Sequence, residues 1–411
     1  MGKRLLILTR TFPPSPGAVG HLVKELGTTL SEAGFVVTVI AAGAGDGEKD
    51  GGLEVVRVGS LPFSRQSHVK RALSYLSLYP AMLWTAARQR RPDVVITTTD
   101  PPLQAVLGWL LKIFFGCKLI HWSQDLYPEM AEEAGVIPKN GALARILRWI
   151  STAALKRHDQ VVSIGRCMSD RLIARGLNPV RITLIENWTD PQWIHPIDQA
   201  VNAFWREQNL SGRFVVLYSG NMGMAHSFSE ILDAAETLQT SAPDVLFLFI
   251  GDGPRRLEVE EESSLRGLSN IRFLPPQPWT TLPESLGAGD VHVVSLRANL
   301  SGLVVPSKFY GGMAAGRACL FIGPEKCEIA QLIAAHRTGK VMPPNDPAKL
   351  VAAILDYRDD ATLLKGDNER ARRLGEGATL ENAIRQFLEL LSKVSPRPSS
   401  INVPSQGVDC R

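Results

Sequence analysis

The sequence predicts an α/β protein made of two doubly wound, Rossmann-like domains that face each other across a cleft. Strand-like and helix-like stretches alternate along nearly the whole chain, which is typical of βαβ units. The strand-like stretches are short and β-branched, as at 94–96 (Val-Val-Ile), and buried parallel strands have this composition. With 411 residues, 45% of them hydrophobic, the chain is long enough for two packed cores. In such folds, ligands bind at the carboxyl ends of the strands.

The first alternating series predicts a domain over residues 1–190. Its strands are expected at 4–9, 36–41, 54–58, 93–97, 117–122, 159–163 and 181–185. Its helices are expected at 19–33, 69–90, 102–115, 141–157 and 167–175. Weak periodicity and many Trp, Pro, Asn and Gln residues indicate a hinge over 191–212.

The second series predicts another domain over residues 213–380. Its strands are expected at 214–219, 245–250, 270–274, 290–294, 318–322 and 339–342. Its helices are expected at 228–239, 254–266, 280–287, 307–315, 326–335 and 346–358. A last helix over 381–394 is expected to pack back on the first domain, and the Pro/Ser-rich tail 395–411 is expected to be disordered.

Composition excludes several classes of protein. The five cysteines are scattered without CxxC spacing, which argues against a disulfide framework or a zinc site and for a reducing compartment. The apolar run 5–8 ends at Thr9 and indicates a first strand rather than a signal peptide. No apolar run is long enough for a membrane-spanning helix. We therefore expect a cytoplasmic protein, with the basic excess of the first half either plain solvated surface or a contact with an anionic membrane.

Two strand–glycine–helix corners in the second domain suit phosphate binding. In 217–223 (Leu-Tyr-Ser-Gly-Asn-Met-Gly), the glycines would let backbone amides approach a phosphate, although a purely structural turn is an alternative. The second corner, 249–254, contains Gly251 and should lie beside the first, with Asp252 capping the following helix and Pro254 in its first turn.

The most informative stretch is 302–317. Ser307 is a good N-cap for the helix that follows, and Lys308 stands in its first turn. A lysine there is unfavourable for the helix dipole, and such a break of a local rule often marks function. An anion bound between the helix N-terminus and the Lys308 ammonium would relieve the conflict.

Together these stretches resemble the retaining GT-B glycosyltransferases of family 4. The order YSGNMG, FIGDGP, NIRFLP and VPSKFYGGMAAGR carries the resemblance, and its PSK element is similar to bacterial enzymes of the WbuB-like group, which build O-antigen, exopolysaccharide or similar glycans. The Pro/Gly-rich loop 12–20 also fits, as does WSQDLYPE at 122–129, which is similar to the group's D-L-x-P-E. The resemblance covers residues 1–393.

The resemblance implies a UDP- or GDP-linked sugar donor in the second domain and a glycan or polyprenyl-linked acceptor in the first. Lys308 would neutralise the diphosphate, and Ser307 would order its turn. Asp125 would orient the acceptor or the donor, or else make a structural hydrogen bond. The other residues carried over are Gly220, Asn221, Gly223 and Gly251 on the donor side, and Gly17 and Gly20 in the acceptor-side loop.

Two departures from the family pattern concern the donor. Two glutamates that grip the sugar and the ribose in many members fall on Leu303 and Gly311 here, and His226 stands nearest to the usual basic residue after the glycine loop. Donor recognition would then use other groups, and the backbone amides of Ser301, Gly302 and Leu303 are the candidates.

The absence of any Asp-x-Asp in the sequence favours a metal-independent reaction without a cofactor. Two alternatives share the fold: a non-catalytic homologue that only binds sugar nucleotides, and a sugar-nucleotide epimerase, which would need carboxylates that 302–317 lacks. A dinucleotide-dependent oxidoreductase is disfavoured because no GxGxxG follows the first strand. No motif favours nucleic-acid binding. Apolar residues mixed with cations at 70–91, 103–115 and 145–149 indicate either core helices or helices that lie on anionic lipid.

Overall fold

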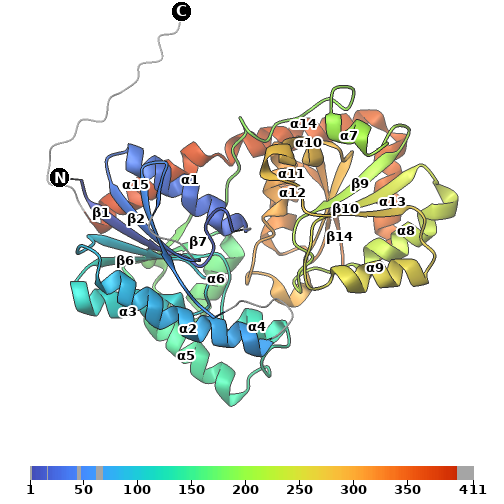
Figure 1. Cartoon of the computed structure of the whole chain (residues 1–411). Helices are drawn as coiled ribbons and strands as arrows, with labels where there is room; N and C mark the ends of the chain where they lie inside the picture. The colour runs from blue at the N-terminus through green and yellow to red at the C-terminus, as the bar shows by residue number, and fades with distance from the viewer. Residues whose placement is uncertain (1, 16, 44–47, 62–67, 396–411) are drawn as a thin grey trace, which may run out of the picture.

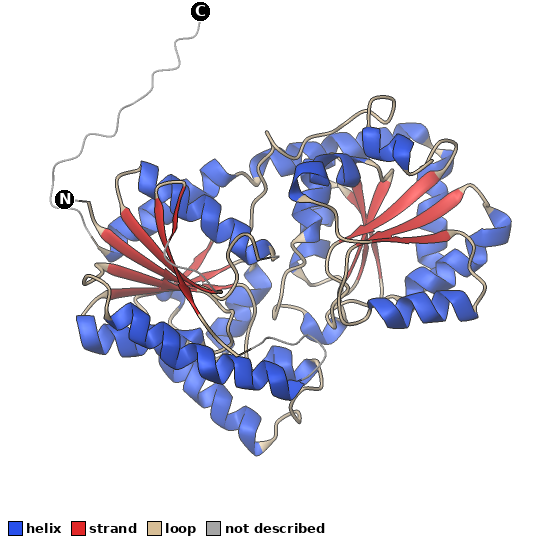
Figure 2. Cartoon of the chain, in the orientation of Figure 1, coloured by secondary structure: helices blue, strands red, loops and turns tan. Residues whose placement is uncertain are grey.

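The computed structural model describes residues 2–15, 17–43, 48–61 and 68–395, and it contains two parallel sheets flanked by helices (Figures 1 and 2). The first sheet has eight strands in the order β3-β4-β2-β1-β5-β6-β7-β8, and the second has six in the order β11-β10-β9-β12-β13-β14. Every pairing is parallel except that of β3 with β4. The predicted fold class is confirmed.

The first sheet and its helices follow the predicted order. Their bounds are β1 (Arg4–Leu8), α1 (Ala18–Glu32), β2 (Val36–Ala42), β3 (Glu48–Asp50), β4 (Leu53–Val58), α2 (His68–Ala87), β5 (Val94–Thr97), α3 (Gln104–Phe115), β6 (Lys118–Ser123), α4 (Glu129–Glu133), α5 (Ala142–Leu155), β7 (Gln160–Ser163), α6 (Arg166–Ala174) and β8 (Ile182–Leu184).

The second sheet and its helices span the rest of the described chain. Their bounds are α7 (Ala203–Glu207), β9 (Phe214–Ser219), α8 (Ser229–Ser241), β10 (Val245–Ile250), α9 (Arg256–Leu265), β11 (Ile271–Leu274), α10 (Leu282–Gly287), β12 (Val291–Ser295), α11 (Lys308–Ala314), β13 (Ala318–Ile322), α12 (Glu328–His336), β14 (Gly339–Met342), α13 (Pro347–Asp359), α14 (Ala361–Gly377) and α15 (Leu380–Val394).

Four of these elements were not predicted. Strand β3 and helices α4 and α7 are each five residues or shorter, too short for a periodic pattern. Helix α14 is long, but its sequence is highly polar and contains three glycines. One of them, Gly375, is needed where α14 packs on α11, because a Cβ there would lie 2.7 Å from the Ala314 nitrogen. Tertiary packing outweighs low helix propensity at this position.

Helix α15 returns from the second domain and packs beside α1 on the first (Figure 1). Its Phe387 is fully buried and meets the rings of Trp122 and Trp188 edge-on, at centroid distances of 5.2 and 6.3 Å. Full burial of a side chain of this size stabilises by about 1.5–3 kcal/mol. The last helix therefore joins the two domains. Nearly all of the predicted disordered tail, 396–411, lies outside the described residues.

Helices α2, α3 and α5 cover the other face of the first sheet (Figure 1). None of the helices in the described part of the chain is long and apolar enough to cross a membrane. Both sheets direct the carboxyl ends of their central strands, β1, β5 and β6 in one domain and β9, β10 and β12 in the other, into loops that carry the predicted site residues.

Candidate functional site

Two glycine loops meet at the carboxyl ends of β9 and β10. The Gly220 amide donates to the Ile250 carbonyl at 2.8 Å, and the Met222 amide donates to the Asp252 carbonyl at 2.8 Å. Gly251 has a φ of +145°, and a side chain there would overlap the Gly220 carbonyl. The predicted closeness of the two corners is therefore present, and it depends on glycine at position 251.

Asp252 does not hold the N-cap position of the helix that follows, contrary to the sequence interpretation. Helix α9 begins at Arg256 with Arg255 in the N-cap position, so Pro254 also precedes the helix. The Asp252 carbonyl is instead used to hold the first glycine loop. A side chain at Gly253 would lie 2.6 Å from the Met222 carbonyl, which makes this second corner a tight backbone contact.

Lys308 extends from the first turn of α11 to the glycine loop after β9. Its Nζ donates to the Tyr218 hydroxyl, lies 3.4 Å from the Asn221 carbonyl oxygen, and stands 3.9 Å from the centroid of the Tyr218 ring. Its Cε is 3.5 Å from the position that a Gly220 Cβ would take. Lys308, Gly220, Asn221 and Gly251 are thus brought together as predicted.

His226 completes the surroundings of this ammonium. Its Nδ1 lies 2.6 Å from the Ser295 carbonyl oxygen, which can only accept, so Nδ1 carries the proton and Nε2 accepts from Lys308 at 3.1 Å. Burial, reinforced by the Lys308 charge, holds the pKa of His226 well below its ordinary value, and burial also lowers the pKa of Lys308. Within the described part of the chain, Lys308 makes no ion pair with a carboxylate.

Ser307 and Gly223 occupy the positions that the sequence indicated but act through the backbone. Ser307 is the N-cap residue of α11, yet its exposed side chain makes no capping hydrogen bond, and its carbonyl accepts from the Tyr310 amide at 3.1 Å. The Gly223 carbonyl accepts from the His226 amide at 3.2 Å, which closes the glycine loop.

The turn of Ser301, Gly302 and Leu303 joins the domains. The Ser301 and Leu303 amides donate to carbonyls within their own turn, at 3.3 and 3.0 Å, so they are not available to a donor sugar in this arrangement. Gly302 has a φ of +74°, and a side chain there would lie 2.6 Å from the Cys167 carbonyl of the first domain. That these amides read the sugar stays a prediction, which would require the Ser301 and Leu303 amides to give up these hydrogen bonds.

Leu303 is 2% exposed and lies in the contact between the domains. Its carbonyl accepts from the Leu126 amide at 2.9 Å, and Val304 forms an antiparallel bridge with Asp125. The first domain also contributes Arg171, whose Nη2 donates to the Ser301 carbonyl at 2.9 Å. The segment 301–304 of the second domain is therefore in direct backbone contact with the loop that contains Asp125, the predicted acceptor-side carboxylate.

Asp125 follows β6 in a largely buried, acidic environment. Burial, and then the charge of Asp100, raise the pKa of Asp125 to about 7. Asp100 in turn accepts from Arg10 Nε at 2.7 and 2.9 Å. Asp125, Tyr127 and Arg175 are among the residues that line a small cavity of about 10 Å³, the size of a single water site.

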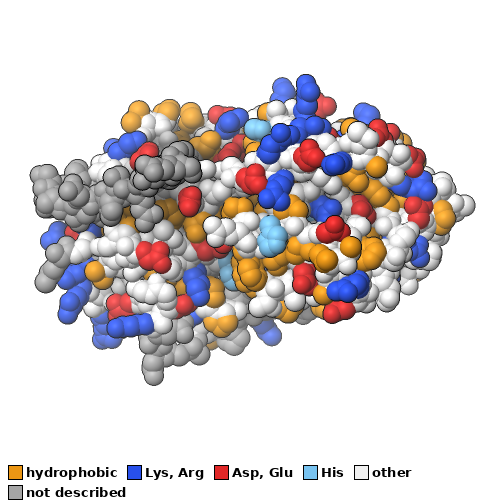
Figure 3. All heavy atoms as spheres, turned by 90° about the horizontal axis from the view of Figure 1, so that it is seen from above, with side chains coloured by type: hydrophobic (Ala, Val, Ile, Leu, Met, Phe, Trp, Pro, Cys, Tyr) orange, Lys and Arg blue, Asp and Glu red, His pale blue; other side chains and the backbone are white. Residues whose placement is uncertain are grey.

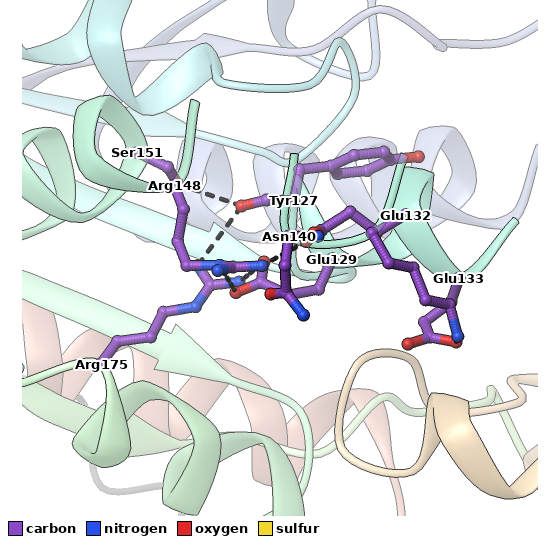
Figure 4. Close-up of polar contacts among 9 residues, drawn as sticks. Tyr127, Glu129, Glu132, Glu133, Asn140, Arg148, Ser151 and Arg175 are labelled. Carbon is purple, nitrogen blue, oxygen red and sulfur yellow. Dashed lines mark hydrogen bonds and ion pairs between the residues drawn. The ribbon is translucent and has the colours of Figure 1, made fainter. Parts of the chain in front are cut away.

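An ion-pair network fixes the loop that carries Asp125 (Figure 4). Glu129 accepts from Arg175 and, at 3.1 Å, from Arg148, which also pairs with Glu132. The Tyr127 carbonyl accepts from Arg175 Nη1 at 3.3 Å. The glutamate of the D-L-x-P-E-like stretch is therefore a positioning residue for the loop, a role that the sequence alone did not reveal.

Gly17 and Gly20 pack the start of α1 against the loop after β1. A side chain at Gly20 would lie 3.0 Å from the Thr11 carbonyl, and Gly17 is the N-cap residue with a φ of +153°. The next residue, His21, stacks on Trp279 of the second domain with a centroid distance of 4.3 Å and an angle of 6°. These glycines thus lie where the two domains meet, beside a ring stack that the sequence did not predict.

A buried carboxylate also crosses between the domains. Glu328, at the start of α12, is 3% exposed, and its Oε2 accepts from the Arg166 amide and, at 3.4 Å, from the Cys167 amide. It therefore caps α6 of the other domain, where a negative charge is favourable. Glu328 and Arg166 are 162 positions apart in the sequence, which explains why no local pattern signals the contact.

A cavity of about 230 Å³ is lined by Arg166 and by parts of 184–188 and 377–386, and none of the predicted site residues lines it. Among the described residues, no group of three or more His, Cys, Asp or Glu side chains is arranged to hold a metal ion.

Comparisons with known proteins agree with this architecture. Residues 17–188 match the family model described as "Glycosyl transferase 4-like domain", and residues 213–360 match "Glycosyl transferases group 1". The chain is 29% identical over 294 residues to WbjE of Pseudomonas aeruginosa, assigned as a glycosyltransferase, with 70% of this chain and 73% of the relative covered. It is 26% identical over 412 residues to WcaI of Escherichia coli (strain K12), assigned as a colanic acid biosynthesis glycosyl transferase, with 94% and 98% covered.

Solved structures show the same fold at low sequence identity. Sucrose-phosphate synthase from Thermosynechococcus elongatus superposes with a TM-score of 0.77 at 17% identity, covering 95% of this chain and 98% of that one. HepE from Anabaena, crystallised with UDP and glucose, superposes with a TM-score of 0.74 at 15% identity, covering 95% and 100%.

Proposed function

We propose, from the premise that this chain is a glycosyltransferase of the GT-B family 4 type, that it moves a sugar from a nucleoside diphosphate sugar to a glycan or polyprenyl-linked acceptor. The transfer retains the anomeric configuration and serves the synthesis of a bacterial surface polysaccharide or glycoconjugate. The relatives assigned to this chemistry, one of them to colanic acid biosynthesis, support the biological setting.

The observation that carries the proposal is the Lys308 ammonium, held beside two glycine loops without a carboxylate partner among the described residues. A half-buried cation that interacts only with a phenol, a carbonyl and a neutral imidazole lacks a compensating negative charge. A diphosphate placed against Gly220 and Asn221 would supply that charge. Burial disfavours the ammonium in the unliganded protein, so the bound anion would raise the pKa of Lys308 again.

The same group would act in the reaction. Cleavage of the sugar–phosphate bond leaves negative charge on the departing diphosphate, and a fixed cation in a water-poor site stabilises that charge most strongly. Gly223 and Gly251 keep the loops free of side chains where the phosphates approach, and Ser307 starts the helix that carries the lysine. We propose that this charge stabilisation needs neither a metal ion nor a cofactor, with a UDP- or GDP-linked sugar as the donor.

The acceptor would lie in the first domain, against the carboxyl ends of β5 and β6. Asp125 would orient an acceptor hydroxyl by accepting its hydrogen bond, because its pKa of about 7 leaves a useful fraction of carboxylate at neutral pH. Gly17 and Gly20 would form the upper wall of the cleft, and Ser301, Gly302 and Leu303 would close it between the domains. A polyprenyl-linked acceptor would place the protein in the cytoplasm, peripherally at the inner face of the membrane.

Donor binding to the full chain tests the proposal. Lys308→Ala should weaken binding of UDP- or GDP-sugars by at least about tenfold in calorimetry and reduce kcat by about 10²- to 10³-fold, because one charge contact to the leaving group is lost. Lys340→Ala is the matched control: its Nζ also stands over a tyrosine ring, 4.9 Å from the Tyr357 centroid, but it pairs with Asp356. Near-normal kcat in Lys308→Ala, or a bound diphosphate far from Asn221 and Lys308, would overturn the assignment.

A further inference from the structure

Large apolar side chains are exposed in unusual number on three neighbouring helices of the first domain. Trp149 is 72% exposed, Ile113 69% and Leu76 66%. The nine exposed side chains of this kind on the three helices are Leu73, Leu76 and Trp84 on α2, Leu110, Ile113 and Phe114 on α3, and Leu143, Ile146 and Trp149 on α5. A solvated protein surface rarely gathers so many, so the cluster indicates a binding surface.

These side chains belong to one face of the molecule. Helix α2 packs beside α3, and α3 packs beside α5, on the side of the sheet opposite α1 and α15 (Figure 1). On α5 the exposed residues Leu143, Ile146 and Trp149 follow a spacing of three, which keeps them on one side of the helix. The inner side of α2 is buried separately through Leu78 and Met82. Each helix therefore has an apolar side in the core and a second apolar stripe toward solvent.

The charged side chains that these three helices carry are all basic. The sequences of α2, α3 and α5 contain no Asp or Glu, whereas Lys and Arg lie on them or at their ends. These cations are Lys70, Arg71, Arg88, Arg90, Arg91, Lys112, Arg145, Arg148, Lys156 and Arg157. Lys112 and Arg148 pair with carboxylates from neighbouring segments, and the Arg88 guanidinium stacks 4.0 Å from the exposed Trp84 ring. The opposite face, seen from above in Figure 3, instead mixes acidic and basic side chains.

We infer that the face formed by α2, α3 and α5 binds the surface of a bilayer that contains anionic lipid. Apolar stripes that enter the interface, surrounded by cations that meet lipid phosphates, are the pattern of a protein that lies on a membrane. A second copy of the same face fits poorly, because its cations would repel those of the first. Nucleic acid would leave Leu76, Ile113 and Ile146 without an apolar partner.

The face formed by α2, α3 and α5 lies near the proposed acceptor side of the cleft, and this link to the acceptor rests on the proposed function. Helix α2 is tied to the loop after β5, because the Tyr79 hydroxyl donates to the Pro102 carbonyl, two residues beyond Asp100. A chain that lies on the membrane through α2 would therefore hold the carboxyl ends of β5 and β6 near the lipid headgroups. A lipid-linked acceptor could then reach Asp125 without leaving the bilayer.

Flotation of the full chain with lipid vesicles tests the inference. We expect binding to vesicles of phosphatidylglycerol and phosphatidylcholine in low salt, little binding to phosphatidylcholine alone, and loss of most binding at about 0.5 M salt, where charges are screened within a few ångströms. Leu76→Ser/Ile113→Ser/Ile146→Ser removes one apolar contact per helix and should lower the partition coefficient by at least about tenfold. The matched control, Leu257→Ser/Leu265→Ser, changes two exposed leucines of α9 and should leave it unchanged.

Separate measurements keep this inference distinct from the proposed function. Donor binding without vesicles, followed by calorimetry, should be equal in the wild type and the triple variant, which also shows that the variant is folded. No flotation with anionic vesicles in low salt would overturn the inference, as would a triple variant that floats like the wild type. If the wild type were a dimer and the triple variant a monomer, the face would be assigned to a second copy of the chain instead. Weakened donor binding in Lys308→Ala with flotation intact is the expected result, since the two sites are separate.

Discussion

Replacing Gly253 with alanine should damage the donor-side loops far more than its size suggests. Gly253 has a φ of +153°, and an added Cβ would stand 2.6 Å from the Met222 carbonyl oxygen and 2.7 Å from its carbon and nitrogen. Real Cβ contacts are not below 3.0 Å, so the Met222 peptide would have to move by at least 0.4 Å (3.0 minus 2.6). That peptide lies between Asn221 and Gly223, in the loop proposed to meet the diphosphate.

The cost has two parts. An L residue in this backbone region costs about 1–3 kcal/mol, and displacing the Met222 peptide puts at risk its 2.8 Å bond to the Asp252 carbonyl, worth about 1 kcal/mol. We expect Gly253→Ala to lose about 2–4 kcal/mol of unfolding free energy in denaturant titrations and to bind donor about tenfold more weakly in calorimetry, which corresponds to about 1.4 kcal/mol.

The control is Gly267→Ala, at the end of α9. Gly267 also has a positive φ, +63°, but a Cβ there would meet nothing within 4 Å. It should cost about 1 kcal/mol of stability and leave donor binding unchanged. Equal effects of the two substitutions on donor affinity would refute the reasoning, because the backbone collision would then contribute nothing.

Three further predictions concern the contacts between the domains and the acceptor side. Asp125→Asn should flatten the acid limb of the kcat/KM profile near pH 7, and an unchanged profile would contradict the role of Asp125. The substitution should also stabilise the protein more at pH 8 than at pH 5, because a carboxyl group with a raised pKa costs stability as pH rises from its unfolded pKa through about 7. Glu328→Gln should destabilise by about 1–2 kcal/mol in denaturant titrations by weakening the cap on Arg166; no change would show that the cap is unimportant. Trp279→Ala should lose about 0.5–1.5 kcal/mol of ring stacking with His21 and increase the population of open molecules in small-angle scattering; unchanged scattering would argue against a closing role.

The sequence predicted best what depends on local pattern. The strands at 214–219 and 245–250 agree residue for residue with β9 and β10, because fully buried parallel strands are continuous apolar runs with clear ends. Helix α14 was not predicted, because its polar sequence with glycines has low helix propensity and is stabilised by packing against α11. Local propensity could not reveal a helix whose stability comes from a partner.

The same distinction holds for the candidate site. Lys308 and the glycine loops could be found because an unfavourable charge at a helix start and glycines after strands are visible in a few residues. Glu328 and the His21–Trp279 stack could not, since each joins segments far apart in the chain and only the folded arrangement brings them together. The hydrogen bonds of the Ser301 and Leu303 amides could not be predicted, because they belong to a turn whose shape the sequence did not specify.

The segment from Leu303 to Lys308 links the two proposed reactants. At one end, the Leu303 carbonyl binds the Leu126 amide and Val304 bridges Asp125, on the acceptor side. At the other end, only four residues beyond Val304, Lys308 extends to the Asn221 loop on the donor side. In many members of the family that the sequence resembles, a sugar-binding glutamate stands at the position of Leu303. Here the Leu303 side chain is buried between the domains. Opening the cleft must break the Leu126 and Asp125 backbone contacts, so in the proposed mechanism domain closure and alignment of the acceptor with the diphosphate occur together.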